Sequence, residues 1–498
     1  MSDILEKEVK IPVVEGHVDL LNYFETYLRE NLEEGYYPIR FVVSKTDDEY
    51  YHCDVGCFRG EWPKQDVPSI FEQKHRTLES TDKFNIALIV PTGVGAIFGG
   101  HAGDATPLAQ LFGSVCDRLI THPNVVNASD INEMPFNTLY VEGSVLTRLM
   151  MGTVGLQPVR ANRILAILED HEDVSFVDNT VNAINAARAC YGLDCENLVV
   201  LYPSFEMDAF ESPSGRAIGH VTQMEHLFAA LDKYKGEYDA IAIASIIRTE
   251  DGVHEEYFES DGDVVNPWGG VEAMLTHTVS HFYDVPAAHG PITELAEHED
   301  LDVGVVDPRM SAEIISTSFL QCVLKGLQRS PRVVTDPVDM TKSQILTAED
   351  VSVLVQPDGC LGVPVLAALE QGIPVIAVRE NKNFMDNPLE KLPWARGQFH
   401  QVETYFEAVG LIQSMKAGIG LNSLKRPLHK AEVNLFMHDA KKQTNVIMDY
   451  YGEEAEALEK FTESDFDYTV DYATEKDDLS LLSDAKDDKD NTTDTSPS

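Results

Sequence analysis

The sequence lacks any apolar run of about 18 residues, the length at which a hydrophobic stretch becomes a candidate membrane span. Residues 1–16, MSDILEKEVKIPVVEG, also lack the apolar core of a secretory signal peptide. These two absences predict a cytoplasmic protein with no membrane partner.

The cysteines give no sign of a disulfide framework, because the seven are scattered and odd in number. This usage is typical of a reducing compartment. Cys53 and Cys57 form a C-x3-C pair, but a zinc site needs two more ligands and His52 is the only obvious neighbour. The pattern favours free thiols over a metal site.

Positive charge is scarce: 38 Lys and Arg residues stand against 83 Asp and Glu, for a net charge of -45. Such a chain repels nucleic acid phosphates and anionic membranes, so neither is an expected partner. From Glu453 to the end the chain is strongly acidic, and after Tyr472 it has few strongly apolar residues. This composition predicts a disordered acidic tail, with a docking segment for a basic partner as the alternative.

The fold class predicted is α/β, with two Rossmann-like lobes and mostly parallel sheets. Short apolar runs followed by helical patterns favour strands that are buried on both faces. Residues 1–80 form a small N-terminal α+β module with a helix at 18–32 and a strand at 39–44. The remaining predicted parts are a first lobe at 81–300, a second lobe at 301–430, and a C-terminal helix with the acidic tail at 431–498.

The strongest local signal is a glycine-rich turn between a strand and a helix in residues 87–107. Glycines let backbone amides approach a ligand, and a helix start favours phosphate or carboxylate. Phe98 replaces the third glycine of a dinucleotide fingerprint, and no lysine completes a P-loop. We predict His101 and Asp104 as catalytic groups. The predicted substrate-binding residues are Thr92, Gly93, Gly95, Gly99, Gly100, Gly103 and Thr106. The alternative is a turn needed only for packing.

A second polar segment, residues 119–148, follows a strand-like run. His122 is the candidate acid–base residue there, because loops at the carboxyl ends of parallel strands form ligand crevices. The segment's predicted substrate-binding residues are Asn124, Asn127, Asp130, Asn132 and Glu133. A divalent cation is compatible with this set, and ordinary turn formation and helix capping are the alternative.

Two further regions carry polar groups near helix starts. His277 and His281 share one face of a predicted helix, but Thr278 stands where a zincin has glutamate. In the second lobe Cys360 precedes a helix, which predicts a reactive thiol, the alternative being a small residue that fits a tight turn. The predicted substrate-binding residues of the second lobe are Asp307, Arg309, Asp358, Gly359, Gly362, Glu380 and Asn381. An Asp307–Arg309 pair that fixes its own turn is an equal alternative.

Several of these runs resemble one protein family. VPTGVGAIFGGHAGDATP, THPNVVNASDINEMP, VVDPRMSAE and PDGCLGVPVLAALEQGIPVIAVREN are similar to the family called domain of unknown function 3326. The resemblance covers roughly residues 40 to 430 and implies one shared fold and site. The family has no established activity to carry over.

Together these features predict an enzyme of small-molecule metabolism that binds an anionic carboxylate or phosphate between two lobes. His101, Asp104, His122 and Cys360 would transfer protons in an isomerase- or lyase-type reaction. One alternative is a non-catalytic regulator that binds a metabolite or nucleotide. Another is a glycosyl- or phosphoryl-transfer enzyme. The cofactor stays open, and a homodimer is the expected assembly.

Overall fold

The computed structural model describes residues 2–14, 19–64, 67–172, 174–292, 304–316, 318–439 and 444–449. The chain divides into two units, Met1–Gly420 and Leu421–Ser498. The described part of the second unit is a 3-10 turn, Leu421–Leu424, and a hairpin of β21 (Asn434–Asp439) and β22 (Thr444–Asp449), where we predicted a helix. The predicted acidic tail lies outside the described residues.

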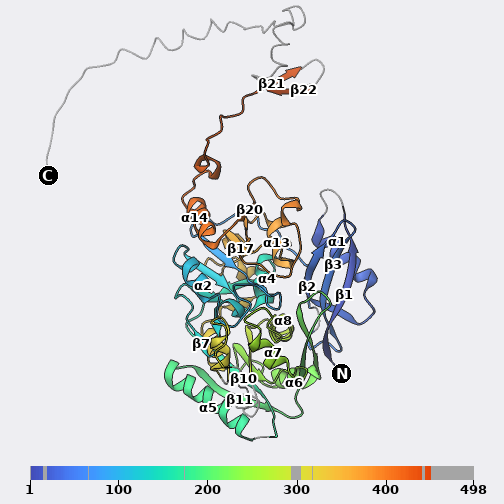
Figure 1. Ribbon diagram of the computed structural model, residues 1–498, viewed down its shortest axis with the longest axis vertical. Coiled ribbons are helices and arrows are strands. Elements are labelled where there is room, and N and C mark those ends of the chain that lie inside the picture. The colour runs from blue at the N-terminus through green and yellow to red at the C-terminus, as the bar shows by residue number, and fades with distance from the viewer. Residues whose placement is uncertain are drawn as a thin grey trace, which may run out of the picture. The chain divides into compact units, whose positions relative to one another are not determined.

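Two sheets of the first unit are parallel, as the continuous apolar runs predict (Figure 1). The six-stranded sheet has the order β20 (Phe399–Val402), β19 (Val375–Val378), β17 (Val353–Pro357), β4 (Asn85–Leu88), β5 (Arg118–Thr121), β8 (Thr138–Tyr140). The four-stranded sheet has the order β11 (Asp194–Leu201), β10 (Arg163–Glu169), β14 (Ala240–Ser245), β15 (Ala287–Pro291).

The third large sheet is antiparallel. Its order is β12 (Glu206–Glu211), β13 (Ala217–Thr222), β1 (Asp3–Pro12), β3 (Tyr50–Arg59), β2 (Tyr36–Thr46), β18 (Leu361–Gly362). Two small ribbons pair β9 (Gly155–Gln157) with β16 (Arg332–Val334), and β6 (Asn127–Ala128) with β7 (Ile131–Asn132).

The predicted domain boundaries do not separate these sheets. The six-stranded sheet takes β4, β5 and β8 from the predicted first lobe and β17, β19 and β20 from the second. The N-terminal strands pair with β13 on one side and β18 on the other, so they are part of a larger sheet. A mixed α/β fold is confirmed at this coarser level.

The six-stranded sheet is buried on both faces. Along β4, Ile86 and Leu88 pack into one hydrophobic cluster, whereas Ala87 and Ile89 pack into another. Alternate side chains of a strand point to opposite faces, so two cores need a continuous apolar run.

Helices cover the sheets and connect their strands. They are α1 (Leu20–Asn31), α2 (Thr106–Gly113), α3 (Pro123–Val126), α4 (Gly143–Met150), α5 (Val174–Tyr191), α6 (Met224–Lys233), α7 (Val253–Glu259), α8 (Gly269–Tyr283), α10 (Ser311–Ile314), α11 (Leu320–Gln328), α12 (Pro337–Met340), α13 (Val363–Gln371) and α14 (Tyr405–Lys416). Helix α8 contacts α4, β2, β13 and β15, and therefore joins the antiparallel sheet to the four-stranded sheet.

The start of α8 packs so closely that only glycine fits. A Cβ on Gly270 would overlap the carbonyl oxygen of Ala217 on β13. We expect Gly270→Ala to lower the free energy of unfolding by about 1–3 kcal/mol, measured by urea denaturation. Gly410→Ala is the matched control, because a Cβ there has open space within α14, and it should stabilise by about 0.5–1 kcal/mol. Equal effects of the two substitutions would contradict this packing.

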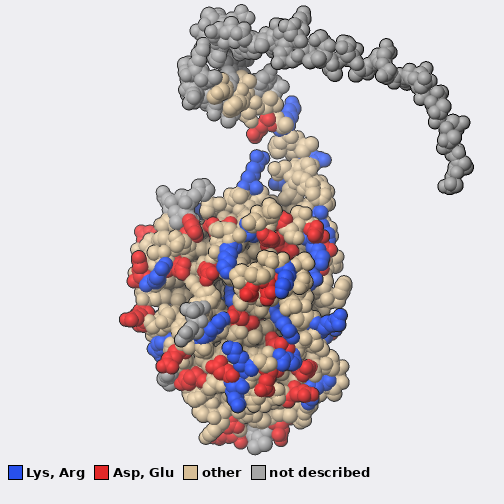
Figure 2. All heavy atoms as spheres, turned by 180° about the vertical axis from the view of Figure 1, so that it is seen from behind, with Lys and Arg blue, Asp and Glu red and all other residues tan. Residues whose placement is uncertain are grey.

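The surface shows no single-sign patch on the face seen in Figure 2, where Lys and Arg lie interspersed with Asp and Glu. Among the helices of the described residues, none has the length and apolar character that a membrane crossing requires.

Candidate functional site

A cavity of about 340 Å³ lies along helix α8 in the first unit. Its α8 lining is a stripe at helical spacing that runs from Gly269 to His281, which corresponds to about 18 Å at the α-helical rise. The opposite walls come from residues at or just after the carboxyl ends of β4, β5, β8 and β17 in one parallel sheet, and of β14 and β15 in the other. Both parallel sheets thus present their ligand-binding ends to one cavity.

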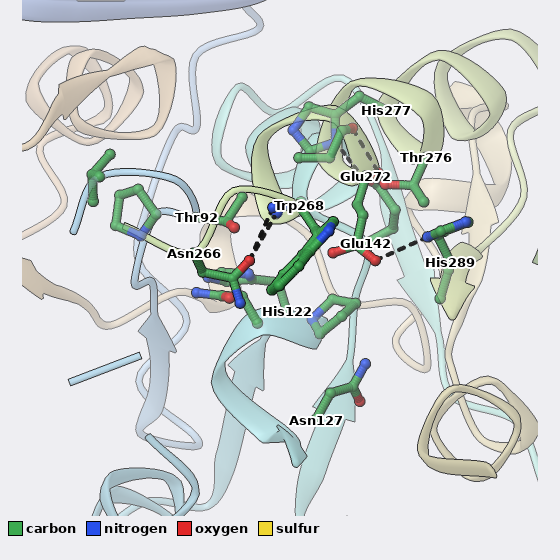
Figure 3. A pocket seen from close by; sticks show the side chains of 18 of the residues that line it. Thr92, His122, Asn127, Glu142, Asn266, Trp268, Glu272, Thr276, His277 and His289 are labelled. Atoms are coloured by element: carbon green, nitrogen blue, oxygen red, sulfur yellow. Dashed lines mark hydrogen bonds and ion pairs between the residues drawn. The ribbon is translucent and has the colours of Figure 1, made fainter. Parts of the chain in front are cut away.

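The buried Glu142 and the partly buried His277 form a pair on the cavity wall (Figure 3). Glu142 caps α4, because its Oε2 accepts hydrogen bonds from the amides of Ser144 (2.9 Å) and Val145 (3.2 Å). Its Oε1 accepts from His277 Nδ1 and from Thr276 Oγ1. Burial alone would raise the pKa of Glu142, but His277, Ser144 and Val145 outweigh it and hold the pKa below its usual 4.5.

Glu272, a second carboxylate on the cavity face of α8, is held by His289 of β15. Its Oε1 lies 2.9 Å from His289 Nδ1, and His289 Nε2 lies 2.9 Å from Ser245 Oγ. Ser245, His289 and Glu272 are connected through the same ring nitrogens as the residues of a hydrolase triad, but the end that faces the cavity is different. Ser245 is fully buried and does not line the cavity, whereas Glu272 lines it with a 26% exposed side chain. The carboxylate, and not the hydroxyl, is therefore the group available to a ligand.

His122 was predicted as an acid–base residue, and it lies on the cavity wall with His277 and Glu142. The amide of Val90 donates to its Nε2 at 3.1 Å, so the neutral ring carries its proton on Nδ1. Burial, with a smaller contribution from His277, lowers the pKa of His122 to about 4. His122 is therefore a neutral hydrogen-bond donor near pH 7.

The glycine-rich turn brings His101 to the same cavity, where its Nδ1 lies 2.7 Å from the hydroxyl of Tyr257. Burial, helped by Arg309, lowers the pKa of His101 to about 4. Glu313 lines the cavity beside it and accepts from the amide of Ala102 at 2.5 Å. Burial raises the pKa of Glu313 and of the neighbouring Asp104 to about 7.

Asn266 fixes the N-terminal end of α8. Its Oδ1 accepts from the amides of Trp268 (3.1 Å) and Gly269 (3.3 Å), and its Nδ2 donates to Glu313 Oε1 at 3.2 Å. Thr92 of the glycine-rich turn packs its hydroxyl against Gly269. This short network joins the turn after β4 to the helix that carries Glu272 and His277 (Figure 3).

The structure brings eight of the predicted site residues to this one cavity. They are Thr92, Gly100, His101, His122, Asn124, Asn127, Cys360 and Gly362. Gly95 and Gly359 both pack against the segment 384–385, whose Met385 also lines the cavity. The two glycine turns are therefore neighbours joined through this segment.

The other glycines of the first turn serve packing. Gly95 and Gly103 have φ of 63° and 88°, and a Cβ on them would meet Phe384 and Ala128. Gly93 and Gly99 pack in the same way against Ala217 and Val90. The packing alternative thus describes these four better than ligand binding does.

The remaining predicted binding residues lie outside the cavity lining, and except for Thr106, whose hydroxyl has no partner, their side chains are bonded within the protein. Thr106 begins α2, and Asp130 accepts from Ser318 Oγ. Asn132 donates to the Cys322 carbonyl, and Glu133 pairs with Lys325 at the surface. Arg309 forks onto Asp307, which is the turn-fixing alternative. Asp358 accepts from Gln401, Glu380 accepts from the Tyr405 amide, and Asn381 binds Phe98 and Tyr405.

Cys360 has a buried thiol. It lines the cavity just before α13, but it is only 3% exposed, and burial raises the pKa of its thiol. The desolvation of a buried thiolate opposes the benefit of the nearby helix start and favours the protonated thiol. Burial and the raised pKa both disfavour the reactive thiol that the helix start led us to predict.

In the part of the chain that the structure describes, no group of three or more His, Cys, Asp or Glu is arranged to hold a metal ion. His277 is bonded to Glu142, and His281 Nε2 lies 3.0 Å from the carbonyl of Pro68.

Sequence reasoning missed Glu142 and Arg40 and did not assign a role to Glu272. Glu142 precedes a helix and has the ordinary pattern of a cap, and Arg40 stands within an apolar strand. An arginine in the buried run IRFVVS was the available signal, because charged residues are almost never buried without a partner.

Residues 85–425 match the family described as "Protein of unknown function (DUF3326)". The chain belongs to this family. The resemblance seen in the sequence motifs is thereby confirmed. No solved structure matches this DUF3326 protein.

A relative from Synechococcus sp. is described as an uncharacterized lipoprotein. It is 34% identical over 336 residues, which cover 67% of this DUF3326 chain and 90% of the relative. This finding contradicts our prediction of a cytoplasmic location. The prediction rested on the absence of apolar runs, but a covalently attached lipid needs no spanning helix.

Proposed function

We propose that this DUF3326 protein is an enzyme that transfers protons on a small anionic substrate bound in the α8 cavity. Supporting this, two separately held carboxylates and a neutral histidine surround one hollow in Figure 3. The Glu272–His289 pair is the observation that carries the proposal. A buried histidine fixes Glu272 at 2.9 Å and leaves it facing the cavity.

In this proposal Glu272 is the general base. It removes a proton from a carbon next to the substrate's anionic or carbonyl group, and the Nδ1–H of His122 donates to the oxygen where negative charge develops. The proton returns at another position, or a leaving group departs, giving an isomerase or a lyase. Neither outcome consumes an oxidant or reductant. His289 is a positioning residue.

The experiment is proton exchange into solvent. The protein is incubated in D₂O with a panel of small carboxylates and phosphate esters, and loss of C–H signals is followed by proton NMR. We expect exchange with at least one compound, and Glu272→Gln should slow it by at least about 100-fold. Glu196→Gln is the control, because that side chain is 77% exposed on β11.

Two outcomes oppose the proposal. Exchange that survives Glu272→Gln would remove the assigned base. Saturable binding of a compound without any exchange would favour the alternative of a metabolite-binding regulator.

A further inference from the structure

Arg40 is a buried cation without a direct partner. It lies on β2, is 9% exposed and lines the α8 cavity. The carboxylates near it, Glu6 and Asp54, are bonded to Arg216 at 2.9 and 2.5 Å. Arg40 Nη1 has no hydrogen-bond partner, and within the described ranges no ion pair joins Arg40 to a carboxylate. A buried guanidinium in this state is costly, and an anionic ligand would supply the missing acceptor.

The first turn of α13 lies beside Arg40. Gly362, the residue before α13, pairs with Val42 of β2, two residues from Arg40. No side chain caps this helix, and Pro364 contributes no N–H, so the amides of Val363 and Val365 are the donors of the first turn. Gly362 and Val363 line the same cavity as Arg40. Helix-start amides and a guanidinium both favour a negative group.

We infer that Arg40 and the first turn of α13 form a carboxylate subsite that holds the acidic group of the substrate. The charges of the surrounding residues favour this class over phosphate. Arg40 and Arg216 carry two positive charges, and Glu6 and Asp54 carry two negative ones. One carboxylate adds a single negative charge beside Glu6 and Asp54, whereas a phosphate dianion adds two.

The subsite rests on the proposed function for its role in catalysis, but its test needs no turnover. The full chain is titrated with sodium acetate and, separately, with inorganic phosphate at constant ionic strength, and the unfolding temperature is followed. We expect a saturable rise with acetate. Arg40→Gln should weaken acetate binding at least tenfold, and Arg40→Lys, which keeps the charge but loses the fork, should weaken it less. Arg332→Gln, on an exposed arginine, is the control and should bind as the wild type does.

A carboxylate built into the protein by substitution provides a second, independent test. Gly362 has φ -147° and ψ -177°, an extended conformation suited to a capping residue, and a Cβ there makes only ordinary contacts. Gly362→Asp should place its own carboxylate at the start of α13 beside Arg40. We expect a higher unfolding temperature than in the wild type, together with loss of the acetate response.

Three results would overturn the subsite. They are wild-type acetate affinity in Arg40→Gln or Arg40→Lys, an unchanged acetate response in Gly362→Asp, and stabilisation by phosphate but not by acetate. Acetate binding that follows this pattern without any proton exchange would support the subsite and refute the proposed enzyme alone. The two claims therefore fail separately.

Discussion

Replacing Glu142 with leucine is expected to lower the free energy of unfolding by about 3–5 kcal/mol, measured by chemical denaturation. One carboxylate serves the first amides of α4, the hydroxyls of Ser144 and Thr276, and His277. Leucine fills a similar volume but leaves these donors buried without an acceptor, and each such group costs about 1–3 kcal/mol.

Glu142→Gln separates charge from shape. Its amide oxygen still accepts from the α4 amides, so the loss should be smaller than for leucine. The pKa of Glu142 is lowered in the folded state, so its contribution is present above the usual 4.5 and is lost as the pH falls below that value. The difference between wild type and Glu142→Gln should therefore shrink on acidification. A leucine variant within 1 kcal/mol of wild type would show that the pair contributes little.

Asp104→Asn is expected to stabilise the protein at pH 8 by roughly 2–4 kcal/mol while changing little at pH 4. Burial raises the pKa of Asp104 from 3.8 to about 7, so the folded state keeps its proton where the unfolded chain has lost it. The contribution of Asp104 to wild-type stability is therefore most favourable below about pH 4. It becomes less favourable as the pH rises to about 7 and is constant above that. Asparagine resembles the protonated acid and its oxygen can still accept from the Gly99 amide.

Asp307→Asn is the matched control. Arg309 lowers the pKa of Asp307, so the expected change in stability has the opposite sign to that of Asp104→Asn. That variant should be less stable than wild type near neutral pH, and the difference should disappear as the pH falls below 3.8. Denaturation at several pH values from about 3 to 8 measures both effects. A pH-independent effect of Asp104→Asn would mean that Asp104 is already ionised in the folded protein.

The positions of the strands could be predicted from the sequence, but the pairing of one strand with another could not. The runs around β4, β17 and β19 have the continuous apolar pattern of buried parallel strands, and all three lie in one parallel sheet. Nothing in such a run specifies its neighbour, so one sheet was divided between two predicted lobes. The same limit hid the antiparallel sheet, whose strand β18 has only two residues.

The site could be predicted where chemistry coincides with a strand end. His122 and Cys360 follow β5 and β17, and both lie on the cavity. Glycine was the less reliable signal, because a close contact such as that of Gly103 with Ala128 needs it as much as a ligand does. The role of Glu142 depends on His277, which is far away in the sequence, and that of Arg40 on the lack of a partner. No local sequence pattern encodes either condition.

The pairing of β18 with β2 has a practical consequence for anyone who divides this protein into fragments. The family match begins at residue 85, after β1, α1, β2 and β3 have ended, yet β2 supplies the cavity wall that carries Arg40. A truncated chain cut at that boundary would keep the histidines and carboxylates but lose the strand that faces them. Experiments on the family-matching segment alone would thus use an incomplete pocket, and a negative result in such an assay would say nothing about the whole chain.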